Sequence, residues 1–192
     1  MITTPSGINR CPWAQNSTPE MQAYHDTEWG VPHHDDRALF ELLTLEGAQA
    51  GLSWRTVLAR RDAYRQAYHG FDIDRVATTT DAELEALITG SALIRHRQKI
   101  HSVRDNARAA QAVIAQHGSL DAYLWSFTDG APIVNRWTEG RDVPATTPLS
   151  VRMSKALRKE GFRFMGSTIC YAFMQASGMV NDHLVSCFRH GR

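Results

Sequence analysis

Apolar residues recur at helical spacing along most of this 192-residue chain. Leu39, Leu42 and Leu43 fall on one such stripe. Asp35 precedes the stripe and is able to cap a helix over residues 37–49. A second stripe runs along the long segment 97–116 and comprises Ile100, Val103, Ala107, Ala110 and Ile114. Spacing of this kind predicts amphipathic α-helices that each bury one face.

The remaining segments predict an all-α protein. Further helices are expected over residues 54–68, 82–88, 119–127, 150–161 and 166–178. Ser53 and the pair Thr80–Asp81 stand before two of these segments as caps. No alternating run is long enough to predict a strand, and residues 128–148, rich in Pro, Gly and Thr, indicate a surface excursion. We therefore expect a helical bundle that forms a single domain over residues 1–192.

Composition narrows the class of protein. A hydrophobic share of 43% and a charged share of 21% are typical of a soluble globular domain. Because the chain has neither a signal peptide nor an apolar run of about 18 residues, we expect a cytoplasmic protein. A net charge of +1 does not suggest a nucleic-acid partner, so bound DNA would require locally concentrated positive charge. Three cysteines without an export signal favour reduced thiols or metal ligands over disulfides.

Two pairs of cysteine and histidine suggest a metal site. His183 and Cys187 are four residues apart, a spacing that would place both on one face of a helix. Cys11 and His25 form a looser pair near the other end of the chain. Two cysteines and two histidines make a closed tetrahedral set typical of structural zinc. The alternative is that Cys187 is simply buried and His183 exposed. Cys170 is expected to pack in the core on a helix in either case.

One carboxylate stands on an apolar stripe. Glu46 follows Leu39, Leu42 and Leu43 at helical offsets, and a carboxylate there costs free energy unless it has a partner or a task. The alternative is that the helix end lets Glu46 reach water. The small residues of QAGLSW, just beyond Glu46, permit either a close approach to a ligand or simply a tight turn.

Aromatic residues are concentrated in the first third of the chain, at Trp13, Tyr24, Trp29 and Trp54. Core packing explains most tryptophans and tyrosines taken singly. Together, and beside an acidic residue, their faces also suit a flat cationic ligand.

Basic residues follow two predicted helices. The first stripe comprises Arg97, His101, Arg104 and Arg108, and the second comprises Arg152, Lys155, Arg158 and Lys159. The segment SALIRHRQKI before the long helix predicts a hairpin between two helices, which can present backbone amides to a phosphate. Solvent-exposed helix faces are often basic without binding DNA, so each stripe can also be explained as an ordinary exposed face.

Longer motifs resemble a known family. They are RCPWA, YHDTEWGVP, LFELLTLEGAQAGLSW, LIRHRQKI, ALRKEGFRFMGSTICYAFMQASGMVNDH and the final Cys187. From about Cys11 to Cys187 the chain is similar to the DNA-3-methyladenine glycosylase I family of the helix-hairpin-helix glycosylase superfamily. The resemblance implies a helical bundle with a helix-hairpin-helix DNA-binding element at about residues 87–100.

The resemblance also implies roles for the candidate residues of the pocket. Glu46 and Tyr24 would contact the edge of an extruded base, with Glu46 the catalytic residue. Trp13 and Trp54 would pack about the base, and Trp29 would help to wall the pocket.

The same resemblance implies a structural zinc ion and a DNA surface. One Zn²⁺ per chain would join the termini through Cys11, His25, His183 and Cys187. Gly51 and Leu52 would approach the gap left in the duplex, and the DNA-binding residues would further include Arg95, Arg97 and Lys99. The partner would be double-stranded DNA containing alkylated adenine. The protein would bind it as a monomer, and no membrane association is expected.

Two departures from the family pattern affect this expectation. Met21 stands where the family has a further pocket tyrosine, and Ala48 replaces a glutamine. The segment HSVRDNARA lacks the glycine-rich loop and aspartate of most relatives in the superfamily, and no lysine stands where its lyases keep their nucleophile. The resemblance thus implies a monofunctional enzyme that releases 3-methyladenine and leaves an abasic site.

Two rival functions differ in class. The run His33-His34-Asp35-Asp36 could serve a metal-dependent hydrolase, although helix capping by the two aspartates explains it more simply. A zinc-stapled DNA-binding module without catalysis is the second rival.

Overall fold

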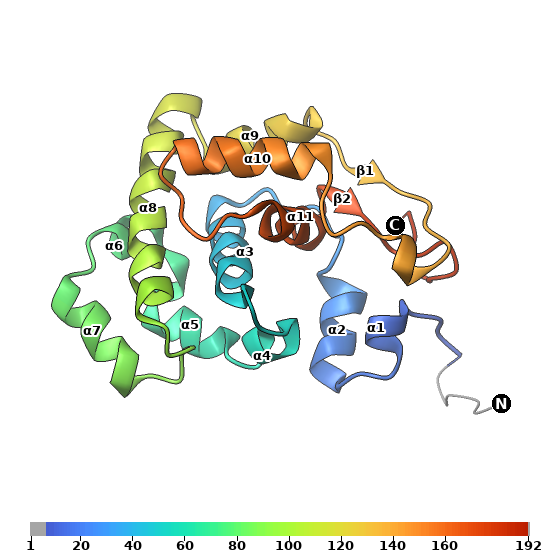
Figure 1. Cartoon of the computed structure of the whole chain (residues 1–192), viewed down its shortest axis with the longest axis horizontal. Coiled ribbons are helices and arrows are strands. Elements are labelled where there is room, and N and C mark those ends of the chain that lie inside the picture. The colour runs from blue at the N-terminus through green and yellow to red at the C-terminus, as the bar shows by residue number, and fades with distance from the viewer. Residues whose placement is uncertain (1–6, 192) are drawn as a thin grey trace.

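Helices make up most of the protein, as the hydrophobic pattern predicts (Figure 1). The computed structural model describes residues 7–191. Its α-helices there are α1 (Pro12–Gln15), α2 (Pro19–Thr27), α3 (Asp36–Gln49), α4 (Trp54–Leu58), α5 (Arg61–Ala67), α6 (Ile73–Ala77), α7 (Asp81–Gly90), α8 (Arg97–His117), α9 (Leu120–Trp125), α10 (Pro148–Lys159) and α11 (Ser167–Ala176). Short 3₁₀ turns cover His69–Phe71, Ser126–Thr128 and Gly140–Asp142. No helix of the described part is long and apolar enough to cross a membrane.

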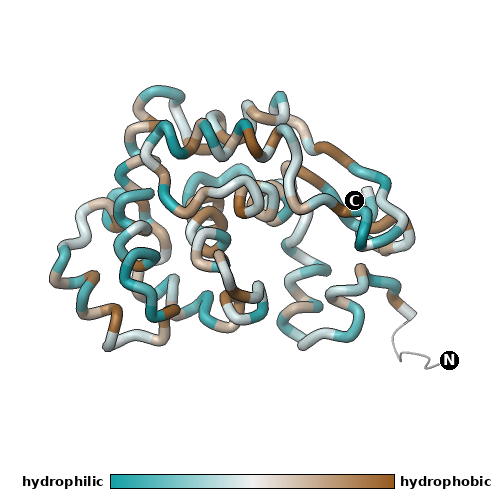
Figure 2. The backbone as a smooth tube through the Cα atoms, viewed as in Figure 1, coloured by the Kyte–Doolittle hydropathy of each residue, from teal (hydrophilic) through white to brown (hydrophobic). Residues whose placement is uncertain are grey.

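Helix α3 forms the centre of the bundle. Its residues 39–48 are all buried, and it packs against α4, α8, α9 and α11. Figure 1 shows α3 and α11 in the middle, with α8 on one side and α1 and α2 on the other. In Figure 2, hydrophilic and hydrophobic segments follow one another along α8, as expected of a helix with one buried face.

The predicted caps begin the helices where the sequence places them. Asp35 accepts a hydrogen bond from the backbone N–H of Ala38 at the start of α3, and Ser53 caps α4 in the same way. Thr80 and Glu83 form a reciprocal capping box on α7. Each such cap satisfies backbone donors that the first helical turn leaves free.

The single helix expected over residues 54–68 is divided in two. Helix α4 ends at Leu58, Arg60 leaves helical geometry at φ −112° and ψ 3°, and α5 begins at Arg61. The break brings Arg61 and Arg65 against the buried carboxylate of Glu41 on α3. These tertiary ion pairs, which periodicity does not register, accompany the break.

The excursion over residues 128–148 is present and contains one short strand. Strand β1 (Ile133–Val134) pairs in parallel with β2 (Val180–Asn181), which follows α11. These two-residue strands form the only sheet in residues 7–191. The pairing carries the excursion past α11 and back toward the N-terminal helices (Figure 1).

A pair of contacting helices also lies at the predicted hairpin. Helix α7 packs against α8, and residues 91–96 connect them. The side chain of His96 caps α8 by accepting a hydrogen bond from the backbone of Lys99.

Candidate active site

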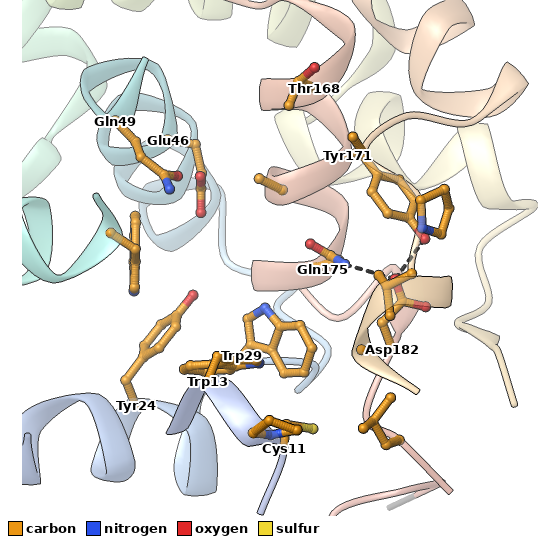
Figure 3. Close-up of a pocket in the computed structure, with 18 of the residues that line it drawn as sticks. Cys11, Trp13, Tyr24, Trp29, Glu46, Gln49, Thr168, Tyr171, Gln175 and Asp182 are labelled. Atoms are coloured by element: carbon orange, nitrogen blue, oxygen red, sulfur yellow. Dashed lines mark hydrogen bonds between the residues drawn. The ribbon is translucent and has the colours of Figure 1, made fainter. Parts of the chain in front are cut away.

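An aromatic cavity of about 470 Å³ lies between the N-terminal helices, α3, α4 and α11 (Figure 3). The structure brings together all the residues expected at the base pocket, because its lining includes Trp13, Tyr24, Trp29, Glu46 and Trp54. Residues 140 and 143–145 of the excursion complete the rim. Met21 also lines the cavity, whereas Ala48, the second departure, is buried but does not line it.

Glu46 enters this cavity from the last turns of α3 without a protein partner. The residue is 3% exposed, so the alternative that the helix end lets it reach water is wrong. Its Oε2 atom is buried and has no hydrogen-bond partner among the described residues. Burial raises the pKa of Glu46 to about 8, because a carboxylate loses its hydration there. A carboxyl group in this state is suited to a ligand that brings hydrogen-bond donors or positive charge.

The aromatic side chains pack on one another around the cavity. Trp13 meets Trp29 edge to face at 5.2 Å between ring centroids, and Tyr24 lies 5.1 Å from Trp54. Trp13 is 39% exposed, so core packing does not explain it. Burial, and next the charge of Glu46, raise the pKa of Tyr24 well above its usual range. Its neutral hydroxyl can therefore serve as a donor.

The opposite wall consists of residues that the sequence interpretation missed. They are Thr168, Tyr171 and Gln175 on α11 and Asp182 after β2, while Gln49, also missed, lies beside Glu46 on α3 (Figure 3). Asp182 is 1% exposed and accepts four hydrogen bonds, from Asn135, Trp137, Tyr171 and Gln175. In the sequence Asp182 stands in the motif NDH, directly before the candidate metal ligand His183.

The loop after α3 forms an exposed projection beside the cavity. Leu52 is 42% exposed, and Gly51 adopts φ +79° with no atom within 4 Å of where a Cβ would stand. Neither residue lines the cavity itself.

Lys99 is not a surface cation. It is 8% exposed, and its Nζ donates to the carbonyl oxygens of Ala48 at 2.9 Å and Ala50 at 2.6 Å. These carbonyls belong to the C-terminal end of α3, where a positive charge is favourable. The geometry therefore does not favour the expected contact of Lys99 with a phosphate, because its ammonium group links α8 to the end of α3 by hydrogen bonds.

The basic stripe of α8 is also largely occupied by the protein. Arg97 and His101 both meet Glu85 at 2.7 Å, Arg104 donates to Asp81, and Arg108 donates to the carbonyl of Ala77. The stripe thus ties α8 to α6 and α7. Arg97 remains 69% exposed and Arg95 is exposed, so both are accessible at the hairpin.

Cys11, His25, His183 and Cys187 form a buried cluster that could hold a metal ion. Their ligand atoms all lie within 4.8 Å of one another, and this is the only such group in residues 7–191. The Sγ atom of Cys187 lies 3.5 Å from His25 Nε2 and 3.5 Å from His183 Nδ1, and Cys11 Sγ lies 3.7 Å from His183 Nδ1. Zn–S bonds of about 2.3 Å and Zn–N bonds of about 2.0–2.1 Å put sulfur and nitrogen about 3.6 Å apart in a tetrahedron. The residues therefore fit zinc.

Neighbouring groups orient both imidazoles toward the centre of the cluster. His25 Nδ1 lies 2.8 Å from Asp26 Oδ1, and His183 Nε2 donates to the carbonyl of Trp29 at 3.0 Å. Such partners direct the other ring nitrogen of each imidazole toward the cluster, where His25 Nε2 also accepts a hydrogen bond from the backbone N–H of Cys11 at 3.3 Å. Burial lowers the pKa of both histidines, that of His183 to about 4, which favours the neutral ligand form.

The C-terminal pair reaches this geometry without a helix. Residues 183–187 contain no helix, with a turn at 185–186 and a bend at 187, so the helical placement considered for their spacing is wrong. His183 is 0% and Cys187 5% exposed, which also rules out the alternative of an exposed His183. The cluster joins α2 and the segment before α1 to the C-terminal turns, and so links the two ends of the chain.

The acidic run before α3 serves to cap helices instead. Asp35 caps α3, and Asp36 accepts hydrogen bonds from the backbone of Leu120 and Asp121 at the start of α9. His34 pairs with Asp121 at 2.8 Å. These contacts favour the capping interpretation over that of a hydrolase site.

Comparisons with known proteins show which family the chain resembles. The family model described as methyladenine glycosylase matches residues 13–190. The chain is 46% identical over 180 residues to DNA-3-methyladenine glycosylase 1 of Escherichia coli, covering 94% of this chain and 96% of that protein. A crystal structure of 3-methyladenine DNA glycosylase I is 48% identical with a TM-score of 0.91, covering 95% of this chain and all of the other.

A second solved structure contains a ligand. It is a 3-methyladenine DNA glycosylase I in complex with 3-methyladenine, 31% identical to this chain, with a TM-score of 0.92 over 96% of this chain and 99% of the other. The likeness covers nearly the full length in both sequence and fold. The family suggested by the sequence motifs is confirmed, and the chain belongs to the methyladenine glycosylase family.

Proposed function

We propose that this protein removes 3-methyladenine from alkylated DNA in base-excision repair. It binds double-stranded DNA as a monomer, flips the damaged base into the aromatic cavity and hydrolyses the N-glycosidic bond. The product is an abasic site in an intact strand. The observation that carries this proposal is the unpartnered, buried carboxyl of Glu46 in an aromatic cavity.

The chemistry of the damaged base fits that cavity. Methylation at ring position three makes adenine cationic while it is attached to the sugar, so it is already a good leaving group. Burial raises the pKa of Glu46 to about 8. A cationic base beside Glu46 favours the carboxylate form and so opposes this effect of burial. Aromatic faces add a cation–π attraction of up to about 2 kcal/mol for a desolvated cation.

The reaction then needs little general-acid catalysis. Flipping costs a few kcal/mol and is easiest for a damaged base, which itself contributes to selection. Glu46 and the hydroxyl of Tyr24 hold the edge of the base, Trp13 and Trp54 pack about it, and Trp29 closes the wall. Water attacks the sugar carbon as oxocarbenium character develops, the base leaves as neutral 3-methyladenine with the electron pair of the bond, and the proton lost by the water passes to solvent.

The positions of the lysines support a monofunctional reaction. A lyase requires a lysine near the sugar to form a Schiff base. The chain has three lysines, Lys99, Lys155 and Lys159. None of them lines the cavity, and Lys99 is bound to carbonyl groups of α3.

The projection and the hairpin supply the DNA surface. Gly51 and Leu52 stand beside the cavity, where they can fill the gap that a flipped nucleotide leaves. Arg95, Arg97 and the backbone at the start of α8 contact phosphates on the same side. Lys99 acts indirectly, by holding the end of α3 that carries this projection.

We further propose that the Cys/His cluster holds one structural Zn²⁺. With four protein ligands the ion has no open position, so it supplies a cross-link between the ends of the chain and takes no part in the reaction. Metal analysis of the purified protein should find one zinc per chain. Cys187→Ser should lose the metal and melt at a lower temperature, whereas full retention of zinc would remove Cys187 from the ligand set.

Base release from methylated duplex DNA tests the proposed function. The purified zinc-loaded protein should release 3-methyladenine, detected by chromatography, and strand cleavage should require subsequent alkali. Glu46→Gln should reduce release roughly 10- to 150-fold, the effect of one lost charged hydrogen bond of about 1.5–3 kcal/mol.

The controls separate this function from the rival of a DNA-binding module. The Glu46→Gln variant must keep its zinc and its fold, measured by metal content and circular dichroism. Wild-type protein that binds DNA but releases no base would support the binding module. Release by Glu46→Gln at the wild-type rate would show that the carboxylate is not used.

A further inference from the structure

Asp182 divides its hydrogen bonds between its two oxygen atoms. Oδ2 accepts from Tyr171 Oη at 2.6 Å and from Gln175 Nε2 at 2.8 Å, both on α11. Oδ1 accepts from Asn135 Nδ2 and Trp137 Nε1, each at 2.7 Å, on the excursion. Every partner donates, so the carboxylate is fully supplied with donors.

This network fixes which end of the Gln175 amide faces the cavity. A carboxylate only accepts hydrogen bonds, so the NH₂ group of Gln175 must turn toward Asp182. Its carbonyl oxygen Oε1 then points the other way. Figure 3 shows this oxygen on the cavity side of α11, toward the wall that carries Glu46.

The cavity consequently presents hydrogen-bond acceptors from two walls. Glu46 contributes its unpartnered Oε2 from α3, and Gln175 contributes Oε1 from α11. A hydrogen-bond acceptor in the cavity is complementary to an N–H group of the ligand. It repels a carbonyl oxygen of the ligand at the same position. A buried polar group left without its complement is costly, which is how such sites reject near-isosteric ligands.

We propose that Gln175 is a specificity-determining residue that selects bases with an exocyclic amine over bases with a carbonyl at that position. Asp182 is the positioning residue that holds the amide in the required orientation. The inference rests on the proposed function and adds the feature by which this cavity recognises an adenine ring.

Two free bases test the selection, and the ring N–H that 3-methylhypoxanthine also gains is common to the wild-type protein and its variants, so its contribution cancels when their ratios are compared. In 3-methylhypoxanthine a carbonyl replaces the exocyclic amine of 3-methyladenine. Their affinities for the zinc-loaded protein are measured by quenching of tryptophan fluorescence, and the ratio of the two dissociation constants is the discrimination. Gln175→Met, which keeps the length of the side chain, should reduce this discrimination roughly 2- to 12-fold, as expected for one hydrogen bond. Equal weakening of both bases, with the ratio unchanged, would overturn the proposal.

Two further variants separate orientation from stability. Asp182→Asn offers Gln175 an NH₂ group as well as an oxygen, so the glutamine amide is free to turn and the discrimination should also fall. Its zinc content is measured in parallel because His183 is the next residue. Asn135→Ala is the matched control, since it removes a hydrogen bond from Oδ1, the oxygen that Gln175 does not contact. It should lower stability and leave the ratio unchanged.

The outcomes distinguish this inference from the proposed function. Wild-type protein that binds neither base and releases none from DNA would overturn both. Wild-type protein that releases 3-methyladenine, together with an unchanged ratio in Gln175→Met and Asp182→Asn, would overturn the role of Gln175 alone.

Discussion

Two buried carboxyl groups face the same cavity in opposite surroundings. Asp182 on one wall is 1% exposed and accepts four hydrogen bonds from α11 and the excursion. Glu46 on the other wall is 3% exposed, and its Oε2 has no partner in residues 7–191. The two carboxyl groups are therefore almost equally buried, but only Asp182 is surrounded by hydrogen-bond donors of the protein.

That difference separates a structural carboxylate from one available for a ligand. The donors around Asp182 replace its lost hydration, so its charge stabilises the wall that it joins. Glu46 has no such replacement, and burial raises its pKa to about 8. This destabilisation lies at the position where a bound cationic base can offset it.

The largest effect should follow from removing the supplied carboxylate. Asp182→Ala leaves four donors without an acceptor and should lower the free energy of unfolding by more than about 3 kcal/mol, because each buried donor left unsatisfied costs about 1–3 kcal/mol. Glu46→Gln removes no partner among the described residues and should not lower the free energy of unfolding, because the neutral amide avoids the cost of burying a charge. Urea unfolding of the zinc-loaded proteins measures both. Equal losses would contradict the division between the two walls.

A pH dependence should identify Glu46 as the carboxyl without partners. Its pKa is raised from 4.5 to about 8 in the folded protein, so folding is favoured when Glu46 is protonated. This stability is fully present below pH 4.5 and is lost as the pH rises through about 8. Relative to Glu46→Gln, the wild-type protein should lose at most about 1.4 kcal/mol per pH unit in that window.

Unfolding of both proteins from about pH 5.5 to about pH 8.5, within the window set by the raised pKa, checks this dependence. The metal ligands are common to both, so their titration cancels in the difference. A difference that stays constant with pH would show that Glu46 has an ordinary pKa and an unnoticed partner.

The sequence predicts the helices well because their signals are local. The caps at Asp35, Ser53 and Thr80 and the stripes over residues 37–49 and 97–116 depend on neighbours within one or two turns. The break between α4 and α5 was not predicted, because Arg61 there pairs with residues distant in sequence. The parallel pairing of β1 with β2 is a further long-range contact of two residues in each strand, too short for an alternating pattern.

The site was predicted to the extent that unusual residues reveal it. A carboxylate on an apolar stripe is visible in sequence, and so Glu46 was found. A carboxylate supplied with donors from 7 to 47 residues away is not, and so Asp182 and Gln175 were missed. Lys99 shows the opposite case, because a lysine in a basic stripe gives no local indication that carbonyls of α3 surround it.

Lys99 extends the comparison to a buried cation. Burial lowers its pKa, and its partners are the carbonyls of Ala48 and Ala50. Lys99→Met should lower the free energy of unfolding by about 1–3 kcal/mol, since it removes the donor for these carbonyls. The salt dependence of DNA binding should keep its slope, because this ammonium does not reach a phosphate. A reduced slope in Lys99→Met would restore Lys99 as a DNA contact.

The smallest effect on stability should come from Arg97, an exposed charge at the hairpin. Arg97 is 69% exposed and pairs with Glu85, so Arg97→Glu should alter the free energy of unfolding by less than about 1 kcal/mol. If Arg97 contacts one phosphate, the slope of log K against log salt should fall by about 0.9, because one fewer counterion is released. Binding of free 3-methyladenine should be unchanged, since Arg97 does not line the cavity.

Arg37→Glu is the matched control, because Arg37 is also exposed and paired, but lies at the far end of α3. A slope change shared by both variants would indicate a general effect of charge, and no change in either would place the DNA on another face, such as that bearing Lys155 and Lys159.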